Sequence, residues 1–175
     1  MKMDKVANSG NDEFYTPAYA VRPILKYVAA GSRVWCPFDT ADSNFVRLLE
    51  AKNCTVIATH KNCGEDFLQM DVVTPPPNFI ISNPPYSLKT QVLEKLFRLG
   101  VPFAMLLGIV GLFESQVRFK MFRDNEFEIM YFNRRIAYFK DFADEKPSIH
   151  PPFSSVYITK NMLPNRIVFE SLEQP

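Results

Sequence analysis

Short apolar segments alternate with helix-like segments along most of this chain. A chain with this alternation folds as a mostly parallel sheet with right-handed crossovers and helices on both faces. We therefore predict an α/β fold. The apolar strands are expected at residues 33–38, 55–59, 78–82, 102–107 and 127–132, and the helices at residues 18–30, 42–53, 87–99 and 113–122.

The two ends of the chain depart from this alternation. Residues 1–12 are polar and predict a flexible arm, which leaves residues 13–175 as a single domain without a separate target-recognition domain. Near the C-terminus, two β-rich runs at residues 155–159 and 166–169 are separated by a turn and predict an antiparallel hairpin. At the start of the first helix, Thr16 is the expected N-cap.

Composition restricts the class of protein. Hydrophobic residues make up 47% of the chain and charged residues 22%, and the net charge of +1 excludes a strongly basic nucleic-acid coat. The longest apolar run, residues 101–113, is too short to cross a bilayer. Three cysteines without a CxxC pair suit a reducing compartment, so we expect a soluble intracellular protein and no membrane partner.

The sharpest chemical signal is Asn83-Pro84-Pro85-Tyr86, directly after the apolar strand that ends at Ser82. Two prolines make a stiff loop with few free donors. The amide oxygen of Asn83 and the carbonyl of Pro84 are then neighbouring acceptors, which suit an exocyclic amino group with two hydrogens. The ring of Tyr86 offers a surface on which a planar substrate could stack.

This tetrapeptide resembles the catalytic motif of the S-adenosylmethionine-dependent amino methyltransferases, above all those that act on adenine N6. The segment containing Phe14, Tyr15, Thr16 and Pro17 resembles the aromatic-x-Thr-Pro segment that covers the methionine part of the cofactor in such enzymes. In detail the chain is most similar to the short adenine methyltransferases of phages and prophages, some of which are described as acting on tRNA. The resemblance implies a Rossmann-like methyltransferase fold, S-adenosyl-L-methionine as cofactor, and a cytoplasmic location in a bacterial or phage-infected cell.

The loop after the first strand matches this family in part. Pro37 and Asn44 fit the family pattern, whereas its glycines are absent and Cys36 replaces its acid. A carboxylate near the cofactor's ammonium is favourable, so Asp39 or Asp42 is expected to take over that role. Asp42 could equally cap the following helix.

The second strand and its loop supply further expected cofactor contacts. His60 stands where the family has an acid that binds the ribose. Asp66 and Phe67 resemble the Asp-Phe step that contacts the cofactor's adenine. Cys54, His60 and Cys63 have irregular spacing for a metal, so no metal site is expected.

The substrate is expected to be a flipped or unpaired base, because an adenine inside a duplex cannot reach such a pocket. By resemblance, Phe153 stacks on the base from the face opposite Tyr86. Several basic side chains are candidates for phosphate contacts: Arg118, Lys120, Arg123, Arg134 and Arg135.

The sequence therefore predicts adenine-N6 methylation of nucleic acid, DNA in preference to RNA, by in-line displacement. Alternatives are methylation of a protein glutamine or of cytosine, and a non-catalytic nucleic-acid-binding relative with a defective cofactor loop. Target choice is loose, read by the segment after Lys140, or supplied by a specificity partner. The sequence makes no prediction of oligomeric state.

Overall fold

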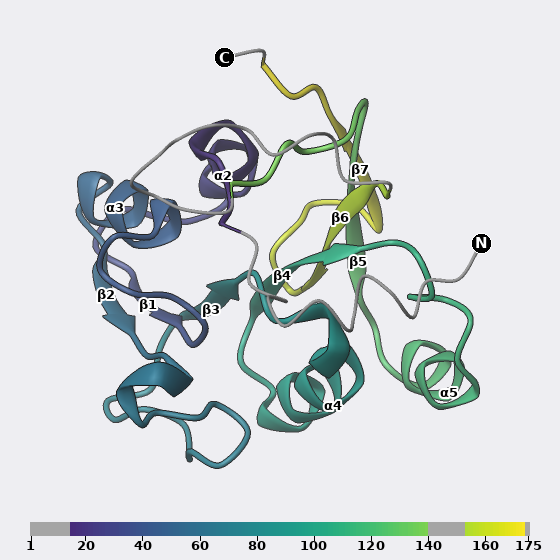
Figure 1. Ribbon diagram of the computed structural model, residues 1–175, viewed down its shortest axis with the longest axis horizontal. Helices are drawn as coiled ribbons and strands as arrows, with labels where there is room; N and C mark the ends of the chain where they lie inside the picture. The colour runs from purple at the N-terminus through teal and green to yellow at the C-terminus, as the bar shows by residue number, and fades with distance from the viewer. Residues whose placement is uncertain (1–14, 140–152, 174–175) are drawn as a thin grey trace.

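The computed structural model describes residues 15–139 and 153–173 of the chain, so the predicted N-terminal arm and Phe14 lie outside the described residues. Figure 1 shows one twisted sheet with helices on both sides. The elements in chain order are α2 (Ala18–Leu25), β1 (Arg33–Cys36), α3 (Asn44–Ala51), β2 (Thr55–Ala58), η1 (Lys61–Cys63), β3 (Phe79–Ser82), η2 (Tyr86–Leu88), α4 (Lys89–Leu99), β4 (Phe103–Gly108), α5 (Gln116–Asp124), β5 (Glu128–Phe132), β6 (Ser155–Lys160) and β7 (Ile167–Glu170).

The seven strands lie in the order β2-β1-β3-β4-β6-β5-β7. Strands β1 to β4 run parallel, β6 is antiparallel to both β4 and β5, and β7 is parallel to β5. The α/β fold class with a mostly parallel sheet is therefore confirmed. The carboxyl ends of β1 to β5 share one edge of the sheet, because β4 and β5 flank the same antiparallel strand.

The predicted C-terminal hairpin is wrong in its pairing. Strands β6 and β7 do have β structure, but β5 lies between them and pairs with both. The physical reason is that β5 carries buried residues, Met130 and Phe132, and gains backbone partners on both sides in this arrangement. A pattern of two apolar runs and a turn does not reveal a third strand inserted between them.

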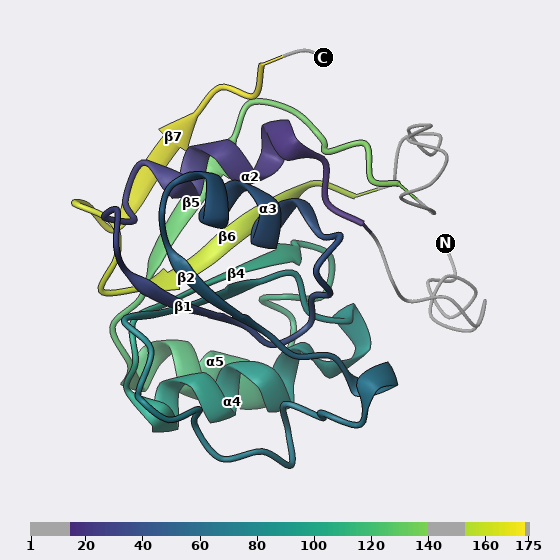
Figure 2. The same ribbon diagram turned by 90° about the vertical axis from the view of Figure 1, so that its left-hand side faces the viewer.

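Two layers of apolar side chains hold the helices on the sheet. Figure 2 shows these helices on the two sides of the sheet. Helices α2 and α3 cover one face through residues such as Ile24 and Leu49. Helix α4 covers the other face through Val92 and Leu96, with α5 beside it. Central strand β4 is buried along its whole length, as expected for a strand covered on both faces.

Several helix boundaries follow local capping chemistry. The side chain of Ser43 caps α3 and that of Ser115 caps α5, while Gly100, with φ of 71°, ends α4. The expected Thr16 cap of α2 is wrong: Pro17 occupies the cap position and makes no side-chain cap. In the described part of the chain, no helix has the length and apolar character that crossing a bilayer requires.

Candidate active site

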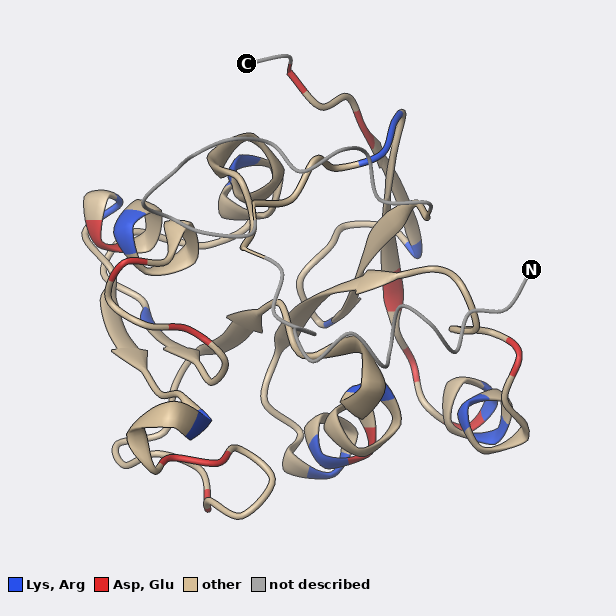
Figure 3. Cartoon of the chain, viewed as in Figure 1, with Lys and Arg blue, Asp and Glu red and all other residues tan. Residues whose placement is uncertain are grey.

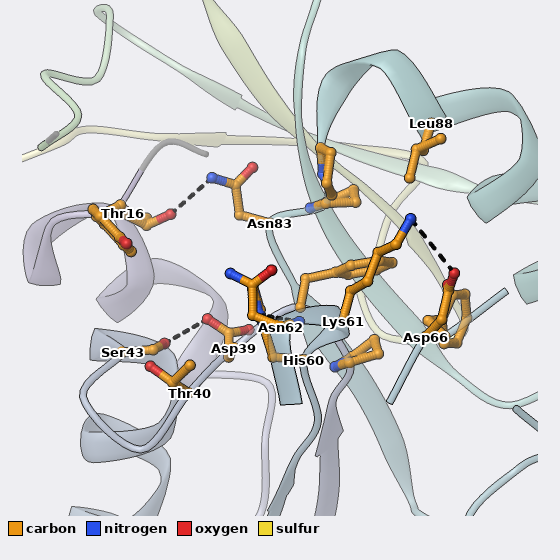
Figure 4. Close-up of a pocket in the computed structure, with 16 residues that line it drawn as sticks. Thr16, Asp39, Thr40, Ser43, His60, Lys61, Asn62, Asp66, Asn83 and Leu88 are labelled. Carbon is orange, nitrogen blue, oxygen red and sulfur yellow. Dashed lines mark hydrogen bonds and ion pairs between the residues drawn. The ribbon is translucent and has the colours of Figure 1, made fainter. Parts of the chain in front are cut away.

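A cleft of about 200 Å³ opens at the carboxyl ends of β1, β2 and β3 (Figure 4). Open α/β sheets bind ligands at this edge. Three loops that are distant in sequence meet there. The cleft is lined by Tyr15, Thr16, Pro37, Phe38, Asp39, Thr40, Ser43, His60, Lys61, Asn62, Asp66, Phe67, Asn83, Pro84, Pro85 and Leu88.

Most of the residues predicted from the sequence lie in this lining. The structure brings together Tyr15, Thr16, Pro37, Asp39, His60, Asp66, Phe67, Asn83, Pro84 and Pro85. Four others do not line the cleft: Pro17, Asn44, Tyr86 and Phe153. Pro17 is the cap residue of α2, and Asn44 begins α3.

The N-terminal segment is attached to the Asn-Pro-Pro-Tyr motif by Thr16. The Asn83 Nδ2 atom donates to Thr16 Oγ1 at 3.1 Å, and Asn44 Nδ2 donates to the Thr16 carbonyl at 2.9 Å. Tyr15 and Phe139 exchange two backbone hydrogen bonds of 3.0 and 2.9 Å. These contacts hold the segment over the cleft and orient the Asn83 amide with its nitrogen toward Thr16 (Figure 4).

Asp39 is the buried acid of the cleft. Its Oδ1 atom accepts a hydrogen bond of 2.5 Å from the Ser43 hydroxyl, and its Oδ2 atom accepts one from the Ser82 hydroxyl. Burial raises the pKa of Asp39 to about 6, while the two serine hydroxyls oppose that rise. The carboxyl group is thus held in place by β3 and α3 and titrates close to neutral pH.

Cys36 and Asp42 do not share this position. Cys36 is fully buried in the core, and burial raises the pKa of its thiol, which keeps it neutral. The Asp42 carboxylate lies outside the cleft and forms an exposed ion pair of 3.2 Å with Arg47. Of the two acids that the sequence offered for this loop, only Asp39 lines the cleft.

The loop from residue 37 to residue 43 needs no glycine for its conformation. None of these residues, all of which the structure describes, has a positive φ. Glycine is required where φ is positive or where a Cβ would clash. The backbone path from β1 to α3 is therefore open to ordinary side chains.

The loop after β2 forms the opposite wall. His60 caps η1, and its Nδ1 atom accepts a 3.2 Å hydrogen bond from the Asn62 backbone. The Asp66 Oδ1 atom accepts from the Leu68 backbone at 3.0 Å, and its Oδ2 atom lies 3.9 Å from Lys61. Acidic residues thus stand on two loops that bound the cleft, those after β1 and after η1 (Figure 3), an arrangement that favours a cationic ligand.

Tyr86 points out of the cleft into an aromatic cluster. Its hydroxyl donates to the Tyr138 hydroxyl at 2.9 Å, which in turn donates to Ser155 Oγ at 2.7 Å. Its ring meets the Phe153 ring edge to face, with centroids 5.4 Å apart and an angle of 79°. The two rings touch each other, so the expected base slot between them is not open in this structure.

The predicted phosphate contacts divide into two groups. Arg118 is buried, and its guanidinium donates to the Leu112 and Gly111 carbonyls and to Thr90 Oγ1. It therefore fastens the loop after β4 to α4, and the phosphate role predicted for it is wrong. Lys120 and Arg135 are exposed, as a phosphate contact requires. Figure 3 shows further basic positions on α4.

Sequence reasoning missed Ser43, Ser82 and Tyr138 as parts of this region. The signal for Ser82 was present, because a hydroxyl at the end of an otherwise apolar strand points to a polar partner at the sheet edge. Tyr138 lies 52 positions from Tyr86, and no local pattern connects the two.

Comparison with known proteins rests on structure alone, because no family model and no curated protein sequence matches the chain. A protein from Vibrio vulnificus YJ016, described as the modification subunit of a type I restriction enzyme, superposes with a TM-score of 0.54 at 13% identity. The superposition covers 98% of this chain and 49% of that one. The two chains therefore share a Rossmann-like α/β fold.

A second solved structure, TrmN from Thermus thermophilus, has a TM-score of 0.45 at 17% identity, over 90% of this chain and 52% of that one. The chain thus spans about half the length of both solved structures. At 13% identity, the likeness to the Vibrio vulnificus protein establishes the fold alone. An activity has to be argued from the residues of the cleft.

Proposed function

We propose that this protein transfers a methyl group from S-adenosylmethionine to the exocyclic N6 atom of adenine in nucleic acid, with DNA as the preferred substrate. One observation carries the proposal: Asn83 and Pro84, two acceptors suited to an amino group, line the same cleft as the buried carboxyl of Asp39. A carboxyl group that would bind a cation and two acceptors that would bind an amino group thus line one cavity.

The lining fits S-adenosylmethionine, which carries a sulfonium and an ammonium group. When bound, this cofactor supplies an electrophilic methyl group. Asp39 would hold the ammonium, since its carboxylate has acceptor sites beyond those used by Ser43 and Ser82. Tyr15 and Thr16 would cover the methionine part, with His60 at the ribose and Asp66 and Phe67 at the adenine.

Asn83 and Pro84 would act on the substrate amino group. The Asn83 amide is oriented by its bond to Thr16, which leaves Oδ1 as the end that accepts a substrate hydrogen. Pro84 has no N–H, so its backbone offers only an acceptor. Two acceptors draw the amino hydrogens away and stabilise the positive charge that develops on nitrogen during the transfer. Neither group has to remove a proton before the transfer.

Tyr86 and Phe153 would receive the base after their rings separate. Stacking on aromatic rings contributes ~1–3 kcal/mol per base, which offsets part of the cost of unstacking it from a duplex. The edge-to-face contact between the two rings has to be exchanged for contacts with the base. We therefore expect substrate binding to include a local rearrangement of these rings.

The absence of positive φ in the loop after β1 supports a catalytic protein over a non-catalytic relative. The non-catalytic alternative depended on the lack of glycine in the loop after β1. The backbone conformation of this loop does not require glycine. Asp39, which is buried three residues after β1, would supply the carboxylate that the family pattern has at Cys36.

The decisive experiment incubates the protein with cofactor labelled in the methyl group and with duplex DNA, single-stranded DNA, tRNA or bulk protein, followed by nucleoside and amino-acid analysis. We expect labelled N6-methyladenine from DNA, formed roughly 10²–10³-fold more slowly by the Asn83→Ala variant. Label in tRNA adenine would show that the substrate is RNA in place of DNA. Label in cytosine or in glutamine would show that the target is not adenine. No transfer to any of them, with no heat of cofactor binding by calorimetry, would overturn the proposal.

A further inference from the structure

Strand β7 forms an open edge of the sheet. In the described part of the chain it pairs with β5 alone, and it stands at one end of the strand order (Figure 2). Three large apolar side chains are exposed beside it: Phe169 at 76%, Ile167 at 55% and Tyr131 at 46%. Natural proteins rarely leave a sheet edge both unpaired and apolar, because it is a template for another strand.

The backbone of β7 shows which groups face outward. The Arg166 carbonyl accepts from Ile129 N at 2.8 Å, and the Glu170 carbonyl accepts from Asn133 N at 3.2 Å. The N–H and C=O groups of successive residues in a strand point to opposite sides. Residues 166, 168 and 170 therefore direct these backbone groups toward β5. The N–H and C=O groups of Ile167 and Phe169 therefore point to the free edge.

One antiparallel register satisfies both outward residues at once. If a second copy of β7 pairs about a two-fold axis at Val168, Ile167 of each copy lies opposite Phe169 of the other. Each of these pairs exchanges two backbone hydrogen bonds. A register shifted by two residues would pair only one outward residue with its own equivalent.

The same register is complementary in charge. It places Arg166 of one copy directly opposite Glu170 of the other, in a non-hydrogen-bonded pair where side chains are closest. Within one chain, Lys26 lies 2.7 Å from Glu170 and Arg166 lies 3.2 Å from Glu126. Across the axis these pairs would join into a row of alternating sign, Lys26, Glu170, Arg166 and Glu126.

We propose that the protein forms a two-fold symmetric dimer in which two β7 strands pair antiparallel and join two seven-stranded sheets into one. We take the partner strand at this edge to be β7 of a second copy. In one and the same register, the outward backbone groups, the opposite charges and the apolar side chains of β7 all meet their complements on the second β7. An isologous interface needs this self-complementarity. The exposed Ile167 and Phe169 side chains meet each other on one face of the joined sheet.

The dimer is independent of the methyl-transfer proposal. The cleft lies at β1, β2 and β3, in the half of the sheet away from β7. Both clefts therefore stay open in the dimer, and its failure would leave the proposed function untouched.

The test measures the mass of the full chain by sedimentation velocity over a range of concentrations. We expect a monomer–dimer equilibrium that Ile167→Pro shifts to monomer, since proline removes only an outward-facing donor and leaves the ladder to β5 intact. Circular dichroism and the melting temperature show that this variant remains folded.

Charge complementation supplies the sharper test. Arg166→Glu and Glu170→Arg each place like charges opposite one another, so each variant alone should be monomeric. An equimolar mixture of the two restores opposite charges at both positions and should dimerise. A loss of folding cannot produce such a rescue. Arg98→Glu, an exposed charge reversal on α4, is the matched control and should dimerise like the wild type.

A wild-type chain that is monomeric at all concentrations overturns the proposal. So does a dimer that survives Ile167→Pro and both single charge reversals, because it would use another surface. Monomeric single variants whose mixture also stays monomeric would overturn the register.

Discussion

The two halves of the Asn-Pro-Pro-Tyr motif lie in different surroundings. Asn83, Pro84 and Pro85 line a cleft beside Asp39, whereas the Tyr86 ring packs against Phe153 and its hydroxyl donates to Tyr138. The difference teaches that the groups proposed for the cofactor and for the amino group line one cleft in this structure. The aromatic pair proposed for the base, by contrast, is closed on itself and has to open.

The largest expected effect comes from the polar half. Asn83→Ala should lower kcat by roughly 10²–10³-fold, because a polar group aimed at developing charge contributes about that much. The cofactor Kd should stay within about twofold of the wild-type value. Single-turnover transfer and calorimetric titration measure the two quantities separately.

Thr16→Val is the control for Asn83, because it removes the hydroxyl that accepts from the Asn83 amide while preserving side-chain shape. We expect a smaller loss of kcat than for Asn83→Ala. Wild-type turnover by Asn83→Ala would show that Asn83 takes no part in the reaction. The proposed difference between the cleft-lining half and the aromatic half of the motif would then be wrong.

The next effect concerns the cofactor. Asp39→Asn should weaken cofactor binding by roughly 10- to 100-fold, the usual contribution of a charge-assisted hydrogen bond. Asp42→Asn, an acid on the same loop outside the cleft, should bind as the wild type does. Equal losses in the two variants would indicate general electrostatics in place of a specific contact.

The pH dependence of that binding follows from the titration of Asp39. With a pKa of about 6, the carboxyl takes up a proton as pH falls through 6, so cofactor affinity should fall in that range and level off above about pH 7. Stability of the free protein should change in the opposite sense. Because the folded pKa lies above the unfolded value of about 3.9, the free energy of unfolding should decrease as pH rises from about 4 to about 6.

Asp39→Asn should remove both of these trends, since it has no proton to exchange. Calorimetry between pH 5 and 8 and urea unfolding between pH 4 and 7 are the measurements. A wild-type protein with flat profiles in both would place the carboxyl in contact with water and contradict its burial.

The aromatic half is tested by Tyr86→Ala and Tyr86→Phe. Loss of the ring should reduce kcat/KM for the nucleic acid by roughly 5- to 100-fold, in line with one stacking contact of ~1–3 kcal/mol. Tyr86→Phe keeps the ring and removes only the bond to Tyr138, so we expect a change of no more than severalfold. Unchanged kinetics for Tyr86→Ala would assign Tyr86 to packing alone.

The smallest effect is expected at Gly108, beneath the aromatic pair. A Cβ added there would lie 3.1 Å from a Phe153 ring carbon and 3.4 Å from a Tyr86 ring carbon. Gly108→Ala should lower the free energy of unfolding by about 1 kcal/mol, at the low end for overpacking a core, if the rings can yield. A loss of several kcal/mol in chemical denaturation would show rigid rings and would contradict the opening proposed for base binding.

Local sequence signals located most of the elements and the edge that holds the cleft. The strands β1 to β5 were expected within a few residues of their observed bounds. For β1, β3 and β4 the reason is that a strand buried on both faces has a continuous apolar sequence. The expected strand ends indicated which loops would meet at one edge of the sheet. Ten of the expected site residues line the cleft at that edge: Tyr15, Thr16, Pro37, Asp39, His60, Asp66, Phe67, Asn83, Pro84 and Pro85.

Long-range pairing decided the remainder. Whether Asp39 or Asp42 faces the cleft depends on hydroxyls from α3 and β3, one of them 43 positions away. The insertion of β5 between β6 and β7 depends on which strands gain buried partners, which no local window contains.

The amino-acid sequence by itself determined the alternation of strands and helices, the sheet edge that holds the cleft, and the pair of acceptors in the Asn-Pro-Pro-Tyr motif. The tertiary structure alone decided that the Tyr86 side chain points away from that pair and that β7 lies at an open edge of the sheet. It also decided that Arg118 is buried and donates to the loop after β4. The physical reason is that hydrophobic period and capping are local properties, whereas ring contacts, buried charge and strand order depend on residues that meet only after folding.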